Sequence, residues 1–79
     1  MRIDKYLKVS QLIKRRTIAN EACDSGRVSI NGKVAKAGTE VNEGDTIEIQ
    51  FGNKIVKAEI LMVKETVKKE EVKTMYKLL

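Results

Sequence analysis

The hydrophobic pattern of this chain changes its period at Gly26, and this change restricts the possible folds more than any other feature. Before Gly26, apolar residues recur every three or four positions, which is typical of amphipathic helices. After Gly26 they alternate with polar residues, and the pair Asn31-Gly32 interrupts the alternation. An Asn-Gly pair in that setting is the strongest short signal for a β-hairpin. Helices followed by hairpins indicate an α+β fold with a small antiparallel sheet.

The helical part is predicted to contain two short helices joined by a basic connector. The spacing of apolar residues predicts the first helix over Ile3–Ile13. Three consecutive cations follow at residues 14–16, and Thr17 is a suitable N-cap for the second helix. Gly26 is predicted to end that helix in the left-handed conformation. The two helices are expected to pack together on the sheet.

The second part of the chain is predicted to form short strands and a short C-terminal helix. We expect strands at residues 27–30, 33–35, 46–51 and 54–64, with turns at Asn31-Gly32 and Gly52-Asn53. In the tail, Val72, Met75, Tyr76 and Leu79 have the spacing of one helical face. The 79 residues are enough for one compact domain and not for two.

The composition makes several functional classes improbable. The chain has no His and a single cysteine, Cys23, so neither a conventional zinc site nor an internal disulfide is expected. Cys23 lies on an apolar helical face, where a buried small residue is expected rather than a catalytic thiol. We therefore predict no enzyme activity, no metal and no cofactor. A lone thiol fits a reducing compartment, so a cytoplasmic location is expected. No apolar run is long enough to span a membrane.

Basic residues are concentrated in the first half of the sequence. Residues 1–36 contain nine basic and three acidic side chains, whereas residues 37–79 contain seven basic and eight acidic ones. All four arginines precede residue 28. A basic half joined to a nearly neutral half is typical of a polyanion-binding face on a scaffold. A role in solubility would explain the lysines of the second half. It would not explain why all the arginines lie in the first half.

The start of the second helix is the predicted centre of an anion site. Arg15 and Arg16 can form bidentate contacts with phosphates, and the helix N-terminus beside Thr17 favours the same ligand. Structured RNA fits better than DNA, since no helix presents a row of base-reading side chains for a major groove. The predicted RNA-binding residues are Arg2, Lys5, Lys8, Lys14, Arg15, Arg16, Thr17, Arg27, Asn31, Gly32, Lys33 and Lys36.

Other interpretations of individual residues remain open at this point. Arg2 could contact RNA or form an ion pair with Asp4, and Lys5 could simply be solvated. Asp4 is expected to orient neighbours or stabilise a helix end rather than to contact RNA. Tyr6 and Phe51 both lie on apolar faces, where core packing is expected. The basic face could also belong to a tRNA-binding module, or to a module that binds proteins or acidic lipids; the chain lacks the Trp and Phe typical of an interfacial helix.

Four segments resemble a known family when they are taken in order. They are Arg2–Leu7, Arg16-Thr17, Ser25–Lys33 and Glu43–Ile47. In this order and spacing they resemble the RNA-binding domain named after ribosomal small-subunit protein four, the S-four type. The resemblance implies the fold of that family, often called alpha-L. It places an S-four-type domain at residues 1–66, with residues 67–79 as a helical extension of the same domain.

A narrower resemblance covers nearly the whole chain. Residues 8–17, 68–72 and the pair Met75-Tyr76 are similar to stand-alone members of the family that act in bacterial ribosome-associated quality control. This similarity implies binding to rRNA and peptidyl-tRNA on obstructed large ribosomal subunits. It also implies cooperation with an RqcH-type tailing factor that adds alanine to the stalled chain. Membrane and DNA partners are not implied.

Overall fold

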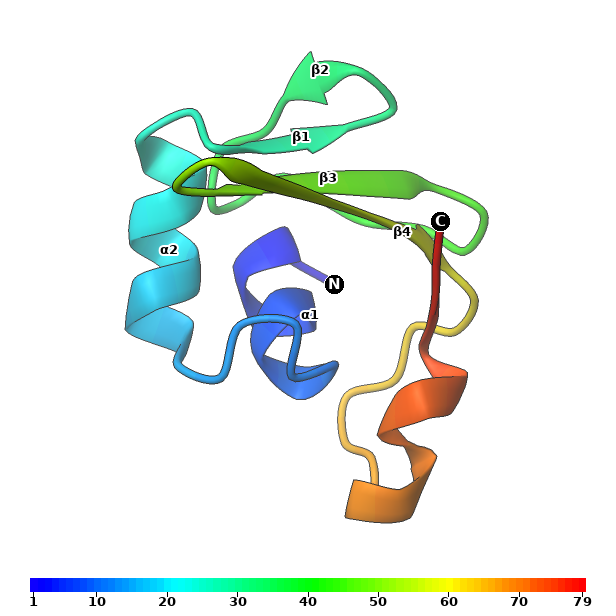
Figure 1. Ribbon diagram of the computed structural model, residues 1–79. Coiled ribbons are helices and arrows are strands. Elements are labelled where there is room, and N and C mark those ends of the chain that lie inside the picture. Colours follow the sequence, from blue (N-terminus) through cyan, green and yellow to red (C-terminus); the bar gives the residue numbers. More distant parts are fainter.

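The computed structural model describes all residues, 1–79, as two helices against one face of a five-stranded sheet (Figure 1). The elements follow the predicted order of helices, hairpins and tail. They are α1 (Ile3–Val9), α2 (Arg16–Asp24), β1 (Val28–Ile30), β2 (Lys33–Val34), β3 (Thr46–Phe51), β4 (Lys54–Ile60), the 3-10 helix η1 (Lys69–Thr74) and β5 (Tyr76–Leu78). The predicted α+β architecture of a single small domain, with a short helix near the C-terminus, is confirmed.

The sheet is antiparallel throughout, with the strand order β2-β1-β3-β4-β5. Strand residues alternate between its two faces, so one face collects the buried side chains. Ile47, Ile49 and Ile60 on this face are at most 1% exposed, and they join the apolar residues of α1 and α2 in a single core. The opposite face carries charged residues such as Glu48, which pairs across the strands with Lys57. The helices therefore cover one face only (Figure 1).

Both short-range backbone predictions around the first hairpin are confirmed. Gly26 follows α2 with φ +81°, a conformation that residues with a side chain rarely adopt. Asn31 and Gly32 have φ values of 50° and 85°, as a type I′ turn between β1 and β2 requires. These two positions fix where the helical part ends and which residues pair in the hairpin.

The first helix is shorter than predicted, because it ends at Val9 rather than at Ile13. Ser10 occupies a position on the apolar stripe and is completely buried. Its hydroxyl donates to the Leu7 carbonyl at 3.3 Å, and such local bonds compete with helical continuation. Gln11 then adopts φ +61°, and the Ile13 N–H donates to the Leu7 carbonyl at 3.0 Å. The chain thus folds into a tight turn after α1.

The second helix does not use Thr17 as its N-cap, so that prediction was wrong. The N-cap is Arg15, whose backbone is extended (φ −116°, ψ 132°) and whose side chain makes no capping bond. The Ala19 N–H donates to the Arg15 carbonyl at 3.0 Å, so the helix starts at Arg16, two residues earlier than a Thr17 cap would allow. Thr17 is therefore an exposed residue of the first turn of α2.

The C-terminal part differs most from the prediction. Strand β4 ends at Ile60 instead of Lys64, and residues 61–68 form an irregular connection to η1. The predicted helical face continued to Leu79, but residues 76–78 form β5 and pair with β4. As an edge strand, β5 forms hydrogen bonds with backbone N–H and C=O groups of β4 that would have no partner if the tail were a helix. The apolar residues that were predicted to form one helical face of the tail belong instead to a 3-10 helix and the strand that follows it.

The carbonyl of Met75 joins the first helix to the C-terminal segment. It accepts hydrogen bonds from the Tyr6 hydroxyl at 2.7 Å, the Leu61 N–H at 2.8 Å and the Met62 N–H at 3.2 Å. Tyr6 and Met75 are both fully buried. Burial, and to a smaller extent the nearby Tyr76, raises the pKa of the Tyr6 hydroxyl, so it remains a hydrogen-bond donor at physiological pH. The prediction that Tyr6 packs in the core is confirmed.

Removing this hydroxyl in Tyr6→Phe is expected to lower stability by about 1 kcal/mol, because one buried hydrogen bond is lost while the two backbone donors remain. For a domain of this size the corresponding decrease in melting temperature is about 4–8 °C. Thermal unfolding followed by circular dichroism measures it. Tyr76→Phe is the matched control, since the Tyr76 hydroxyl makes no hydrogen bond within the chain. Equal melting temperatures for Tyr6→Phe and the unaltered protein would contradict the assignment.

Two further core predictions have opposite outcomes. Cys23 is completely buried, and burial together with the charges of Asp4 and Asp24 raises the pKa of its thiol to about 11. It is a packing residue, as predicted.

Phe51 lies two residues after Ile49 in β3, so alternation places it on the same face of the sheet, but it is 42% exposed. It lies at the end of β3, next to the Gly52 turn, so the prediction that Phe51 packs in the core was wrong.

Candidate RNA interface

A buried carboxylate lies at the centre of the basic face. Asp4, in the first turn of α1, is 2% exposed and accepts hydrogen bonds from four groups. The Arg2 guanidinium lies 3.3 Å away, the Arg16 Nη2 3.5 Å, the Asn20 Nδ2 3.2 Å and the Lys5 backbone N–H 2.8 Å. About half of the surface of each arginine side chain remains exposed. Asp4 thus holds two half-exposed guanidinium groups in place, and each keeps further N–H donors that form no hydrogen bond within the chain.

The balance of forces keeps Asp4 ionised. Burial alone would raise the pKa of this carboxyl group. The Asn20 hydrogen bond, the charges of Arg16 and Arg2 and the Lys5 backbone N–H outweigh burial and hold the pKa below its ordinary value of 3.8. The expected orienting role of Asp4 is consistent with this arrangement. The Arg2–Asp4 ion pair, one of the two interpretations of Arg2, is present in the structure.

The lowered pKa of Asp4 predicts how stability depends on pH. A carboxyl group with a depressed folded-state pKa stabilises the fold above its unfolded value, and this contribution is lost as the pH falls through the folded value. We expect the difference in unfolding free energy between the protein and Asp4→Asn to be constant from pH 7 to about pH 5. It should shrink once the pH falls below the ordinary value of 3.8. Urea unfolding at each pH measures this difference, and a constant difference down to pH 2.5 would contradict the prediction.

A polar hollow opens next to the two arginines. It has a volume of about 500 Å³ and no hydrophobic lining residue. Its lining residues are Arg2, Asp4, Arg16, Thr17, Asn20 and Glu21. The N-terminus of α2 adds donors beside it, because the backbone N–H groups of residues 16–18 have no acceptor within the chain. The first turn of α2 also contains no acidic residue that could compete for them. We name this region the Asp4 hollow.

The hairpin residues lie in a second region. Arg27 follows the C-terminal end of α2, about 13 Å along the helix from Arg16. Asn31 is held within the fold, since its side chain donates to Asp45 at 3.1 Å and accepts from the Thr46 N–H at 2.9 Å. Gly32 and Lys33 are exposed at the turn. Asn31 therefore shapes the hairpin, and its side chain is not free to bind a ligand.

The loop after the hairpin connects the two regions. The Ile3 N–H donates to the Thr39 carbonyl at 2.7 Å, and the Asp4 N–H donates to the Ala37 carbonyl at 3.3 Å. These bonds place the exposed Lys36, one residue before Ala37, near the start of α1. Lys36 is therefore the hairpin residue that the fold brings towards the start of α1, whereas neither Arg27 nor Lys33 lines the Asp4 hollow.

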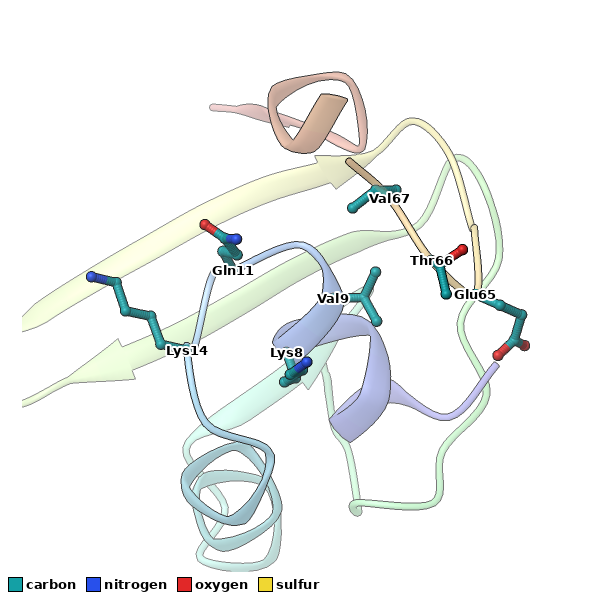
Figure 2. A pocket seen from close by; sticks show the side chains of 7 residues that line it. All are labelled: Lys8, Val9, Gln11, Lys14, Glu65, Thr66 and Val67. Atoms are coloured by element: carbon teal, nitrogen blue, oxygen red, sulfur yellow. The ribbon is translucent and has the colours of Figure 1, made fainter. Parts of the chain in front are cut away.

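The remaining predicted lysines lie on α1 and on the loop that follows it. Lys5 is half-buried and forms an ion pair with Glu65, which lowers the pKa of that carboxyl group through its hydrogen bond and charge. Lys8 and Lys14 are exposed beside a separate hollow of about 440 Å³ (Figure 2). The ion pair makes Lys5 the least available of the predicted cations. Lys8 and Lys14 line this second hollow and do not line the Asp4 hollow.

Two residues of this interface were not predicted from the sequence. Asn20 donates to Asp4 and lines the Asp4 hollow. Its position four residues after Arg16 on the same polar helical face was a usable signal. Glu65 pairs with Lys5 across 60 residues of sequence, and no local pattern indicates such a contact.

The molecule has neither a cluster of metal-ligating side chains nor a membrane-spanning helix. No group of three or more ligating side chains could hold a metal ion. No helix combines the length and apolar character that crossing a bilayer requires. The cationic Asp4 hollow, at the junction of two helices with a hairpin alongside, is thus the principal candidate. Such an arrangement defines a small nucleic-acid-binding protein.

Comparison with known proteins identifies the class and then the group. Residues 1–47 match the S4 domain family. A relative from Halalkalibacterium halodurans, described as an RQC P-site tRNA stabilizing factor, is 63% identical over 96% of this chain and 86% of its own length. A relative of the same description from Bacillus subtilis is 53% identical over all of this chain and 92% of its own. The chain belongs to the S4 domain family and, within it, to the group of these factors.

Solved structures agree with this assignment. The trimeric structure of heat shock protein 15 from Vibrio cholerae has a TM-score of 0.91, with 25% identity, and the match covers all of this chain and 81% of that one. The solution structure of a hypothetical protein, HP1423, has a TM-score of 0.84, with 36% identity, covering all of this chain and 96% of that one. The S-four-type fold expected from the sequence is therefore confirmed, as is the resemblance to the quality-control group.

Proposed function

We propose that this protein binds RNA on obstructed large ribosomal subunits and stabilises the tRNA held in the P site during ribosome-associated quality control. The observation that carries the proposal is the pair of half-exposed guanidiniums, Arg2 and Arg16, fixed by the buried carboxylate of Asp4. Pre-oriented guanidinium groups lose little entropy when they bind phosphate, so they suit the recognition of folded RNA by shape and backbone. The P-site tRNA enters the proposal because the relatives are described as P-site tRNA stabilizing factors.

The proposed action is binding rather than catalysis. The chain contains no His, and its single thiol has a raised pKa of about 11 and is completely buried, so neither a histidine base nor an accessible thiolate is available. We further propose rRNA and peptidyl-tRNA as the direct ligands, an RqcH-type tailing factor as the partner in alanine addition, and the cytoplasm as the site of action. No cofactor is required for this role.

Reconstitution with purified large ribosomal subunits tests the proposal. Subunits that carry peptidyl-tRNA and subunits that lack it are mixed with the protein and separated on sucrose gradients. We expect co-sedimentation with the tRNA-bearing subunits and weaker co-sedimentation with empty ones. Adding the tailing factor with alanine-charged tRNA should lengthen the nascent chain more rapidly in the presence of this protein. Migration at the top of the gradient with both kinds of subunit would refute the ribosomal role and leave the fold assignment intact.

Binding to these subunits is expected to depend steeply on salt. If about four to six cations contact RNA phosphates, the logarithm of the binding constant should fall with a slope of about −3 to −5 against the logarithm of the salt concentration. Affinity would then decrease by about 60-fold to 1,000-fold between 50 and 200 mM monovalent salt. Binding measured by filter retention across this range checks the prediction. A slope near zero would mean that phosphate contacts do not dominate the interface.

A further inference from the structure

The hollow in Figure 2 lies between the end of α1 and the irregular segment that follows β4. Its volume of about 440 Å³ falls within the range of about 300–1,000 Å³ that small-molecule sites occupy. Its lining residues are Lys8, Val9, Gln11, Lys14, Glu65, Thr66 and Val67. This hollow is separate from the Asp4 hollow, with which it shares no lining residue.

The lining combines an apolar wall with polar groups around it. Val9 at the end of α1 and Val67 on the segment after β4 face each other across the hollow (Figure 2). Gln11 contributes an amide that can donate and accept, and Thr66 contributes a hydroxyl. Neither side chain forms a hydrogen bond within the chain. Both groups are therefore free to bind a ligand that offers hydrogen-bonding edges.

One charged residue of the hollow is ion-paired and the other two are not. Glu65 is neutralised by Lys5, whereas Lys8 and Lys14 make no ion pair. The net charge left for a ligand is positive, with Lys8 on α1 and Lys14 on the loop that follows it (Figure 2). A ligand with a phosphate and a planar, partly apolar body with polar edges matches this set better than phosphate alone. Phosphate alone would use neither the valines nor the Gln11 amide.

Gln11 has a backbone conformation that supports a binding role. Its φ of +61° is uncommon for a residue with a side chain, and such strain is concentrated at ligand sites. The conformation is held by the Gln11 N–H, which donates to the Lys8 carbonyl at 3.1 Å, and by the buried Ser10 beside it. The turn therefore fixes Gln11 at the edge of the hollow.

We propose that this hollow binds one unpaired RNA nucleotide. Its base lies against Val9 and Val67 with its polar edge towards Gln11 and Thr66, and its phosphate lies near Lys8 and Lys14. The inference rests on the proposed RNA-binding function and adds a subsite to it. Lys8 lies one helical turn after Asp4, so a single RNA strand can reach both hollows.

Titration of the isotope-labelled protein, followed by NMR, tests the subsite directly. The probes are AMP, CMP, GMP and UMP, with ribose 5-phosphate and inorganic phosphate as controls. We expect at least one nucleotide to shift the backbone resonances of Gln11, Thr66 and Val67 and to bind about tenfold more tightly than ribose 5-phosphate, which corresponds to one or two hydrogen bonds. Equal binding of all six probes, or shifts only around Arg16, would overturn the proposal.

Variants separate this subsite from the proposed function itself. Gln11→Gly removes the amide and suits the positive φ, and Thr66→Val removes the hydroxyl without changing the shape of the side chain. Together they should abolish the preference for a nucleotide over ribose 5-phosphate. Thr46→Val on the sheet serves as the matched control. If large-subunit binding persists while no nucleotide binds, the subsite is refuted and the proposed function stands. If the protein binds neither large subunits nor any nucleotide, the RNA-binding function is refuted as well.

Discussion

Replacing Arg16 by alanine is expected to weaken binding to tRNA-bearing large subunits by about tenfold to a hundredfold. The Arg16 side chain is about half exposed, and its guanidinium lies at the start of α2 beside unpaired backbone N–H groups. A charge-assisted hydrogen bond contributes about 1.5–3 kcal/mol, which corresponds to this loss in affinity. Alanine is well tolerated in a helix, so the fold should persist. Equilibrium binding of fluorescently labelled protein to purified subunits measures the change.

Two substitutions control for the general loss of a positive charge. Arg16→Lys keeps the charge but not the planar fork of donors, and we expect it to restore only part of the affinity. Lys57→Ala removes an exposed cation from the opposite face of the sheet and should change binding by less than about twofold, as expected for a charge outside the contact surface. If Lys57→Ala weakened binding as much as Arg16→Ala, net charge rather than a defined site would explain the interaction.

Replacing Asp4 by alanine is expected to affect both stability and binding. The substitution leaves Asn20 and two guanidiniums without their shared acceptor. Because the cations are half exposed and can be hydrated, the loss in unfolding free energy should be about 1–3 kcal/mol rather than that of an unpaired buried charge. Free arginine side chains must then be ordered when RNA binds, so affinity should fall by about tenfold although the net positive charge increases. Urea unfolding and subunit binding provide the two measurements.

The direction of the binding change distinguishes positioning from charge. If Asp4 only reduced the positive potential of the surface, its removal would strengthen RNA binding. Asp4→Asn keeps the shape and one of the two acceptor oxygens, so it should retain more affinity than Asp4→Ala. Tighter binding by both variants at low salt would contradict the positioning role, even if both proteins remained folded.

Local sequence patterns were sufficient where local forces determine the structure. Gly26 and the Asn31-Gly32 turn were predicted because their backbone conformations have few alternatives. The strand Thr46–Phe51 was predicted with its observed bounds, because its alternation is uninterrupted. The basic cluster around Arg16 was also visible, since the helix N-terminus and the cations are adjacent in sequence. Each of these features depends on residues within a few positions of one another.

Features that depend on distant residues were missed. Helical spacing in the tail gave no indication that Tyr76–Leu78 would pair with β4, because strand pairing is determined by a partner elsewhere in the chain. The exposure of Phe51 reflects the limited area that two short helices can cover. The four hydrogen bonds to Asp4 come from residues as distant in sequence as Asn20. The sequence therefore indicated that Asp4 orients its neighbours, but not which groups bond to it.

The bond between Tyr6 and the Met75 carbonyl spans 69 residues, and this separation affects how the protein is made. During synthesis α1 emerges from the ribosome early, but its buried hydroxyl has no acceptor until Met75 has also emerged. Strand β5 likewise cannot pair with β4 before Leu78 is released. The domain therefore completes its fold only after translation has passed these residues. A copy interrupted before Met75 would lack both contacts, so a protein proposed to act on interrupted translation needs uninterrupted translation for its own folding.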